Sequence, residues 1–129
     1  MTKIIKMNLL PKQIETREKI KTFAPLLGVD INWALAIAMV ESSLGVNQIS
    51  PTGCKGVFQM SSIAMKDLHN LMSASDDDLA DIVCGLSFLS LLKKRWKTTE
   101  EATAHFCDPK EIDNYLSKVK VYMKVFENG

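Results

Sequence analysis

One acidic residue, Glu41, lies in a setting that alters its chemistry. It directly follows the apolar run Trp33–Val40, near the C-terminal end of a predicted buried helix. Low polarity and the negative end of a helix dipole both disfavour a carboxylate, so we expect the pKa of Glu41 to be raised. An acid that keeps its proton near neutral pH can act as a general acid. The alternative is a structural glutamate that loop amides satisfy at the helix end, and this pattern alone leaves both interpretations open.

The chain offers Glu41 no second carboxylate nearby in the sequence. No Asp or Glu occurs from Ser42 through Lys66. Most glycosidases pair an acid with a second carboxylate, which serves as nucleophile or activates water. A site built on Glu41 alone therefore needs a different second step.

The elements that position these residues are predicted to be helices, because apolar residues recur at intervals of three and four and Gly and Pro fall between the periodic segments. The predicted fold is all-α, with about six helices around a central buried helix that ends at Glu41. The expected helices cover Pro11–Leu27, Ile31–Ser43, Ser62–Leu71, a long segment from about Ser75 to Arg95, a segment capped by Thr98–Glu101, and Pro109–Glu127.

Short signals mark the ends of these helices. Asp30 can cap the central helix, and Pro25 and Gly28 are placed to end the helix before it. Gly45 suits the C-terminal cap of the central helix. From Gly45 to Ser61 the sequence has no helical period, which predicts a structured loop.

Apolar periodicity also predicts the inward faces. In the first helix the expected inward residues are Ile14, Ile20, Phe23 and Leu27, and in the last they are Ile112, Leu116, Val119, Met123 and Phe126. The last helix also carries lysines, which is typical of membrane-active amphipathic helices as well as of docked ones. We expect it to dock on the core.

The length and the net charge of the chain exclude several classes of function. A chain of 129 residues corresponds to one domain, expected over residues 1–129 with 1–10 as an N-terminal extension. A formal net charge of +1 provides no strong field for a polyanion, so nucleic acid is not expected as a partner. No apolar run reaches the roughly 18–20 residues of a membrane-spanning helix, so stable membrane insertion is not expected. No Sec-type signal is recognised, and a monomer is expected.

The cysteines Cys54, Cys84 and Cys107 are odd in number and lack the spacing of zinc ligands. We expect buried thiols, with neither a disulfide framework nor a metal site.

The residues after Glu41 resemble a known catalytic motif. A Glu-Ser pair begins at Glu41, Ser-Pro-Thr-Gly begins at Ser50, and Gly-x-x-Gln ends at Gln59, nine and eighteen residues after the acid. This pattern is similar to that of the soluble-type lytic transglycosylases, a family with a lysozyme-like fold. Residues 81–89 resemble the family's Asn-Ile-x-x-Gly-x-x-Tyr-Leu helix, with Asp and Phe replacing Asn and Tyr. The resemblance covers most of the chain from about Ala24 onward.

The resemblance implies a catalytic role for Glu41 and glycan contacts for Ser50 and Gln59. Ser42 is expected to hydrogen-bond carbonyls at the helix end, and Gly56 is expected to meet a backbone requirement. The chain departs from the family at residues 104–108, where Ala-His-Phe-Cys-Asp replaces Ala-Tyr-Asn-Ala-Gly. Because this block lines the sugar cleft in the family, His105 becomes a candidate substrate contact, and Phe106 would also alter the cleft.

The implied reaction cleaves the β-1,4 bond between N-acetylmuramic acid and N-acetylglucosamine in peptidoglycan, without water, metal or cofactor, and leaves a 1,6-anhydro sugar. The expected partners are therefore peptidoglycan glycan strands. A hydrolytic lysozyme is one alternative, and it would need Asp67, Asp81 or Asp108 to activate water. A non-catalytic wall-binding or virion component on a degenerate copy of the fold is another.

The resemblance and the lack of a recognised Sec-type signal together predict a bacteriophage enzyme of the endolysin type. It would be made in the bacterial cytoplasm and would act on the cell wall, released by a holin or carried in a virion.

Overall fold

The computed structural model describes residues 8–47, 56–59, 77–106 and 112–128. Regular structure in these ranges is entirely helical, without strands, which confirms the predicted all-α class. The elements are α1 (Pro11–Phe23), the short 3-10 helix η1 (Pro25–Leu27), α2 (Ile31–Ser42), α4 (Asp77–Arg95), α5 (Thr99–Phe106) and α6 (Ile112–Asn128). The helix expected over Ser62–Leu71 lies outside the described residues.

The first predicted helix is divided at Pro25, which begins η1. Gly28 then ends the segment with a left-handed φ of 72°, as the sequence predicts. Of the residues expected to face inward, Ile20 is fully buried, whereas the prediction for Ile14 is wrong, because Ile14 is 42% exposed. The buried side of α1 runs through Thr16 and Ile20 instead. The helix has few apolar residues, so periodicity alone determined its rotation poorly.

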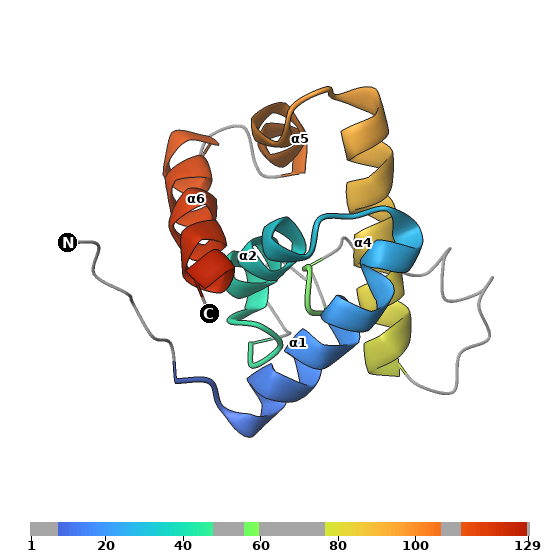
Figure 1. Ribbon diagram of the computed structural model, residues 1–129, viewed down its shortest axis with the longest axis vertical. Coiled ribbons are helices and arrows are strands. Elements are labelled where there is room, and N and C mark those ends of the chain that lie inside the picture. The colour runs from blue at the N-terminus through green and yellow to red at the C-terminus, as the bar shows by residue number, and fades with distance from the viewer. Residues whose placement is uncertain (1–7, 48–55, 60–76, 107–111, 129) are drawn as a thin grey trace.

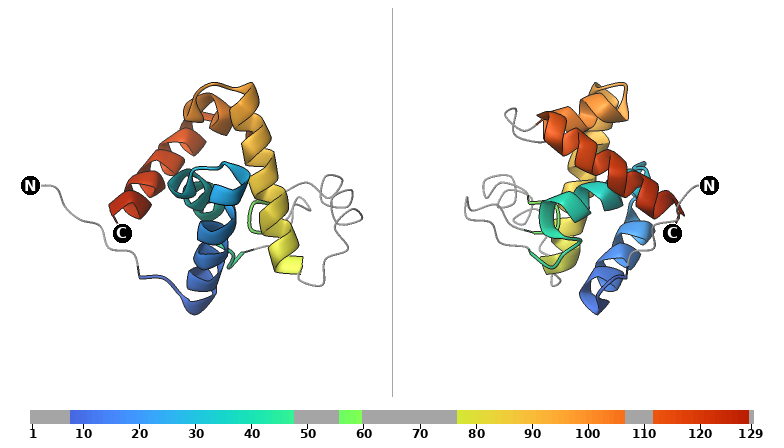
Figure 2. Two further views of the ribbon diagram at one scale, coloured as in Figure 1. Left: turned by 45° about the vertical axis from the view of Figure 1, so that its right-hand side comes forward. Right: turned by 90° about the vertical axis from the view of Figure 1, so that its left-hand side faces the viewer.

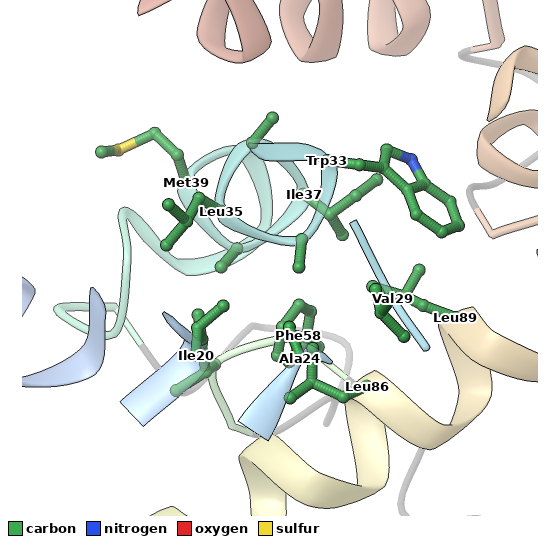
Figure 3. Close-up of a cluster of buried hydrophobic side chains, with 14 of the residues drawn as sticks. Ile20, Ala24, Val29, Trp33, Leu35, Ile37, Met39, Phe58, Leu86 and Leu89 are labelled. Carbon is green, nitrogen blue, oxygen red and sulfur yellow. The ribbon is translucent and has the colours of Figure 1, made fainter. Parts of the chain in front are cut away.

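Helix α2 begins where Asp30 caps it, since the Asp30 carboxylate accepts a hydrogen bond of 2.8 Å from the Trp33 backbone N–H. Residues 33–39 are all buried. Figure 1 and Figure 2 show α2 at the centre, with α6 on one side and α1 and α4 on the other. Figure 3 shows side chains of α1, α4 and Phe58 converging on the face of α2 opposite α6. The predicted central buried helix is confirmed.

Helices α4 and α6 follow their predicted ranges within the described residues, and α5 begins directly after Thr98, in its predicted capping segment. Helix α4 ends at Arg95. The backbone N–H of Glu101, in the first turn of α5, donates to Thr98 Oγ1 at 3.1 Å. The first residues of the last predicted helix, 109–111, lie outside the described residues, and α6 itself docks on α2 with Val119 2% exposed. Partly buried residues of α6, including Met123 and Phe126, pack against the same hydrophobic core.

No helix in the described ranges combines the length and the hydropathy that crossing a membrane requires.

Candidate functional site

Glu41 is the second-last residue of α2, at the end of the buried central helix. The helix stops because residues 43–45 form a left-handed turn, in which Ser43, Leu44 and Gly45 have φ values of 50°, 55° and 94°. A left-handed non-glycine residue costs about 1–2 kcal/mol. Leu44 is fully buried, and its backbone N–H donates to the Ala38 carbonyl at 3.1 Å, so packing and capping hold the turn. Gly45 lies within this turn, although Ser43 rather than Gly45 occupies the cap position.

The Glu41 carboxyl is partly buried and meets a side chain of α6. Tyr115 Oη donates a hydrogen bond of 2.7 Å to Glu41 Oε1. Burial raises the pKa of Glu41, and the Tyr115 hydrogen bond opposes this rise more weakly. The upward direction confirms the prediction made from the apolar run.

No lysine, arginine or histidine in the described ranges forms an ion pair with Glu41. No described residue other than Tyr115 donates a hydrogen bond to its carboxyl. Within the described part of the chain, one oxygen of this carboxyl is therefore engaged, by Tyr115.

Ser42 joins the end of α2 to the turn at residues 56–59. Its hydroxyl lies within hydrogen-bonding distance of the Ala38 and Val57 carbonyl oxygens, at 3.1 Å and 2.5 Å, and it accepts from the Gly45 backbone N–H at 3.0 Å. The expectation that Ser42 would bond helix-end carbonyls is confirmed. The contact with Val57 also brings a segment fifteen residues away beside the acid-bearing helix end.

Gln59 lies two residues beyond Val57 in this turn and is partly buried. Its backbone has a left-handed φ of 50°, and its side-chain Nε2 donates to the Gly56 carbonyl at 2.8 Å. Gly56 has a φ of 89°, so its expected backbone role is confirmed. The turn that carries Gln59 therefore lies at the end of α2, as a glycan contact beside Glu41 would require.

The side chain of His105 contacts another aromatic residue, Trp96. Its ring stacks on Trp96 with centroids 3.7 Å apart and planes 7° apart, and its side chain is exposed. The neighbouring Phe106 packs on Phe88, at 5.6 Å between ring centroids. The structure records no contact between His105 and Glu41, and a glycan contact by His105 stays a prediction.

Several residues singled out in the sequence fall outside the described part of the chain. They are Ser50, Asp67 and Asp108, together with Cys54 and Cys107; Asp81 lies in α4, but its side chain is not among those described. Cys84 is buried, as expected. No group of three or more metal-binding side chains occurs among the described residues.

Sequence reasoning missed Tyr115, the residue that contacts Glu41. Tyr115 is 9% exposed and lies one helical turn before the buried Val119. A tyrosine four residues before a buried valine lies on the same helix face, and a buried tyrosine hydroxyl needs a polar partner. These two signals could have pointed to Tyr115, although nothing in the sequence names its partner 74 residues away.

Compared with known proteins, the chain matches no protein-family model and no curated protein sequence.

Proposed function

We propose that this protein is a peptidoglycan lytic transglycosylase that cleaves the bond between N-acetylmuramic acid and N-acetylglucosamine. The observation that carries the proposal is the partly buried Glu41 carboxyl, whose pKa burial raises and whose single described hydrogen-bond donor is the Tyr115 hydroxyl. The motif from Glu41 to Gln59, which resembles that of the soluble-type lytic transglycosylases, supports the substrate class.

The proposed reaction uses Glu41 twice. Protonated Glu41 donates its proton to the bridging oxygen as the bond from that oxygen to muramoyl C1 breaks. The resulting carboxylate then takes the proton of the muramoyl 6-hydroxyl as its oxygen bonds to C1. The bridging oxygen gains the proton of Glu41, Glu41 regains a proton from the 6-hydroxyl, and no water is consumed.

A single acid suffices because the substrate supplies the nucleophile. An oriented intramolecular hydroxyl replaces a bimolecular attack and avoids its entropic cost. Tyr115 holds one carboxyl oxygen of Glu41, which fixes the direction of the other. The turn of residues 56–59, joined to α2 through Ser42 and Val57, presents Gln59 to the sugar in this proposal.

Product analysis distinguishes transglycosylation from hydrolysis. Peptidoglycan digested with the purified protein and analysed by mass spectrometry should yield anhydromuramoyl ends, which are lighter by one water than reducing ends. Reducing ends as the main product would contradict the proposal and favour a hydrolytic lysozyme.

Substitution of the acid separates catalysis from wall binding. Glu41→Gln keeps the size of the side chain but cannot transfer the proton, so lysis of purified walls should fall about a hundredfold or more. Glu127→Gln removes an exposed carboxylate of α6 and serves as the matched control, with lysis unchanged. Equal lysis by wild type and Glu41→Gln would exclude Glu41 as the acid, and no lysis by the wild type would contradict the proposed function.

A further inference from the structure

The oxygen and the nitrogen of the Gln13 carboxamide each form a hydrogen bond, and together the two bonds connect two elements. Its Oε1 accepts from the Leu10 backbone N–H at 2.8 Å, which caps the first turn of α1. Its Nε2 donates to the Ser43 carbonyl at 2.9 Å, thirty residues away in the sequence. Gln13 thus joins the start of α1 to the left-handed turn that ends α2.

That turn needs support from outside α2. Ser43 and Leu44 both have positive φ values, 50° and 55°, a conformation that L-residues adopt only when surrounding contacts hold it. A left-handed residue at a helix end directs its carbonyl away from the helical ladder. The Ser43 carbonyl finds its donor in Gln13 rather than in α2.

A second contact shows that α1 and the turn pack closely. A Cβ atom at Gly45 would lie 2.5 Å from Thr16 Oγ1, so only glycine fits there. Thr16 is buried and lies three residues after Gln13, on the same side of α1. Two positions of α1, about one helical turn apart, therefore meet the turn of residues 43–45.

These contacts lie two and four residues beyond Glu41, at Ser43 and Gly45. Glu41 is held from one side by Tyr115 of α6, and the helix end that carries it is held by α1, which lies on the other side of α2 (Figure 1). We propose that Gln13 is a positioning residue, whose hydrogen bond to Ser43 holds the end of α2 so that the Glu41 carboxyl stays against Tyr115. Its effect on the reaction rests on the proposed function.

Two substitutions separate this bond from the cap of α1. Gln13→Met has a similar length but loses both hydrogen bonds. Gln13→Glu keeps an acceptor for the Leu10 N–H and adds a negative charge that suits a helix N-terminus, but it cannot donate to Ser43 when ionised. Thr22→Val is the control, since it removes an exposed bond of 2.9 Å to the Glu18 carbonyl within α1.

The titration of the Glu41 carboxyl, followed by carbon NMR well below the unfolding temperature, is the first measurement. In Gln13→Met the loosened helix end becomes more hydrated, so Glu41 should titrate at lower pH than in wild type, whereas Thr22→Val should leave it unchanged. The second measurement is turnover on purified walls, which should fall about fivefold in both Gln13 variants, the value of one typical hydrogen bond.

Wild-type titration and turnover in Gln13→Met would overturn the proposal. So would wild-type turnover in Gln13→Glu, because it would assign Gln13 to the cap alone. If the wild-type protein itself does not cleave walls, the proposed function fails, and the Glu41 titration in Gln13→Met still decides the positioning role.

Discussion

At the scale of single residues, two opposing influences act on the pKa of Glu41 where it meets Tyr115. Burial favours the neutral carboxylic acid, while a hydroxyl that donates to the carboxyl favours the carboxylate. Because burial is the larger influence, the pKa of Glu41 remains raised. In the proposed reaction Glu41 acts as a general acid, which is active below its pKa and loses activity as the pH rises through it.

Removing the tyrosine hydroxyl should therefore move the pH profile in a defined direction. Tyr115→Phe deletes the bond that lowers the pKa of Glu41, so the alkaline fall of kcat/KM should shift to higher pH. At pH values below that fall, the loss of one orienting hydrogen bond should reduce kcat/KM about fivefold. The measurement is wall lysis across a pH series, with Tyr122→Phe on the same helix as the control. A shift to lower pH would contradict the assigned direction.

At the scale of elements, the turn of residues 56–59 is held between α2 and α4. Ser42 bonds Val57 from α2, and Phe58, 1% exposed, packs on α4 at Gly85. A Cβ at Gly85 would lie 2.3 Å from the Phe58 ring, so this glycine makes room for an aromatic side chain. The position of Gln59 thus depends on a glycine in a helix remote from it in the sequence.

Gly85→Ala tests this packing because local preference and packing predict opposite results. Within a helix, alanine is favoured over glycine by about 1 kcal/mol. The clash with Phe58 should instead lower the free energy of unfolding by about 1–3 kcal/mol. Urea unfolding measures the change, and Ser87→Ala on the same helix should change stability by less than about 0.5 kcal/mol. Stabilisation by Gly85→Ala would show that Phe58 does not occupy this space.

Several elements could be predicted because their signals are local. Asp30 caps the residues next to it, and Pro25 and Gly28 act on their own backbone, so the helix ends follow from sequence. The rotation of α1 could not be predicted from its apolar residues. Ile14 is apolar but exposed, and the contacts that bury Thr16 and Ile20 come from other elements. The acid was predicted from its helix, whereas Tyr115 and Gln13 were not, because each meets its partner only after the helices pack.

At the scale of the molecule, α6 completes the core from the side of α2 opposite α1 and α4. One hydrophobic cluster contains buried residues of every described α-helix, including Tyr115 and Val119 of α6. The basic, amphipathic character of α6 is thus accounted for by one face on the core and one in solvent. Docking of α6 on α2 also places the Tyr115 hydroxyl against the Glu41 carboxyl. The fold and the candidate site therefore both depend on the contact between α6 and α2.

Substitution of two valines of α6 tests whether this helix docks on the core or lies on the surface. Val119 is 2% exposed and Val121 is 55% exposed. Val119→Asp buries an unpaired carboxylate and should destabilise the protein by more than about 3 kcal/mol, whereas Val121→Asp should change stability by less than about 0.5 kcal/mol. Urea unfolding of both variants measures the difference. Similar stabilities would mean that α6 does not dock as described.

The two tryptophans give the protein a built-in optical reporter. Trp33 is 1% exposed, and its indole N–H donates to Thr103 Oγ1 at 2.8 Å, while the ring of Trp96 lies against His105 at 3.7 Å. An imidazole ring in contact with an indole can quench its fluorescence, so we expect emission from the native protein to come mainly from Trp33, at short wavelength. Unfolding separates Trp96 from His105 and exposes Trp33 to water. On unfolding, the emission should shift to longer wavelength as the core around Trp33 opens. It should also gain intensity from Trp96 as the contact between the end of α4 and α5 is lost.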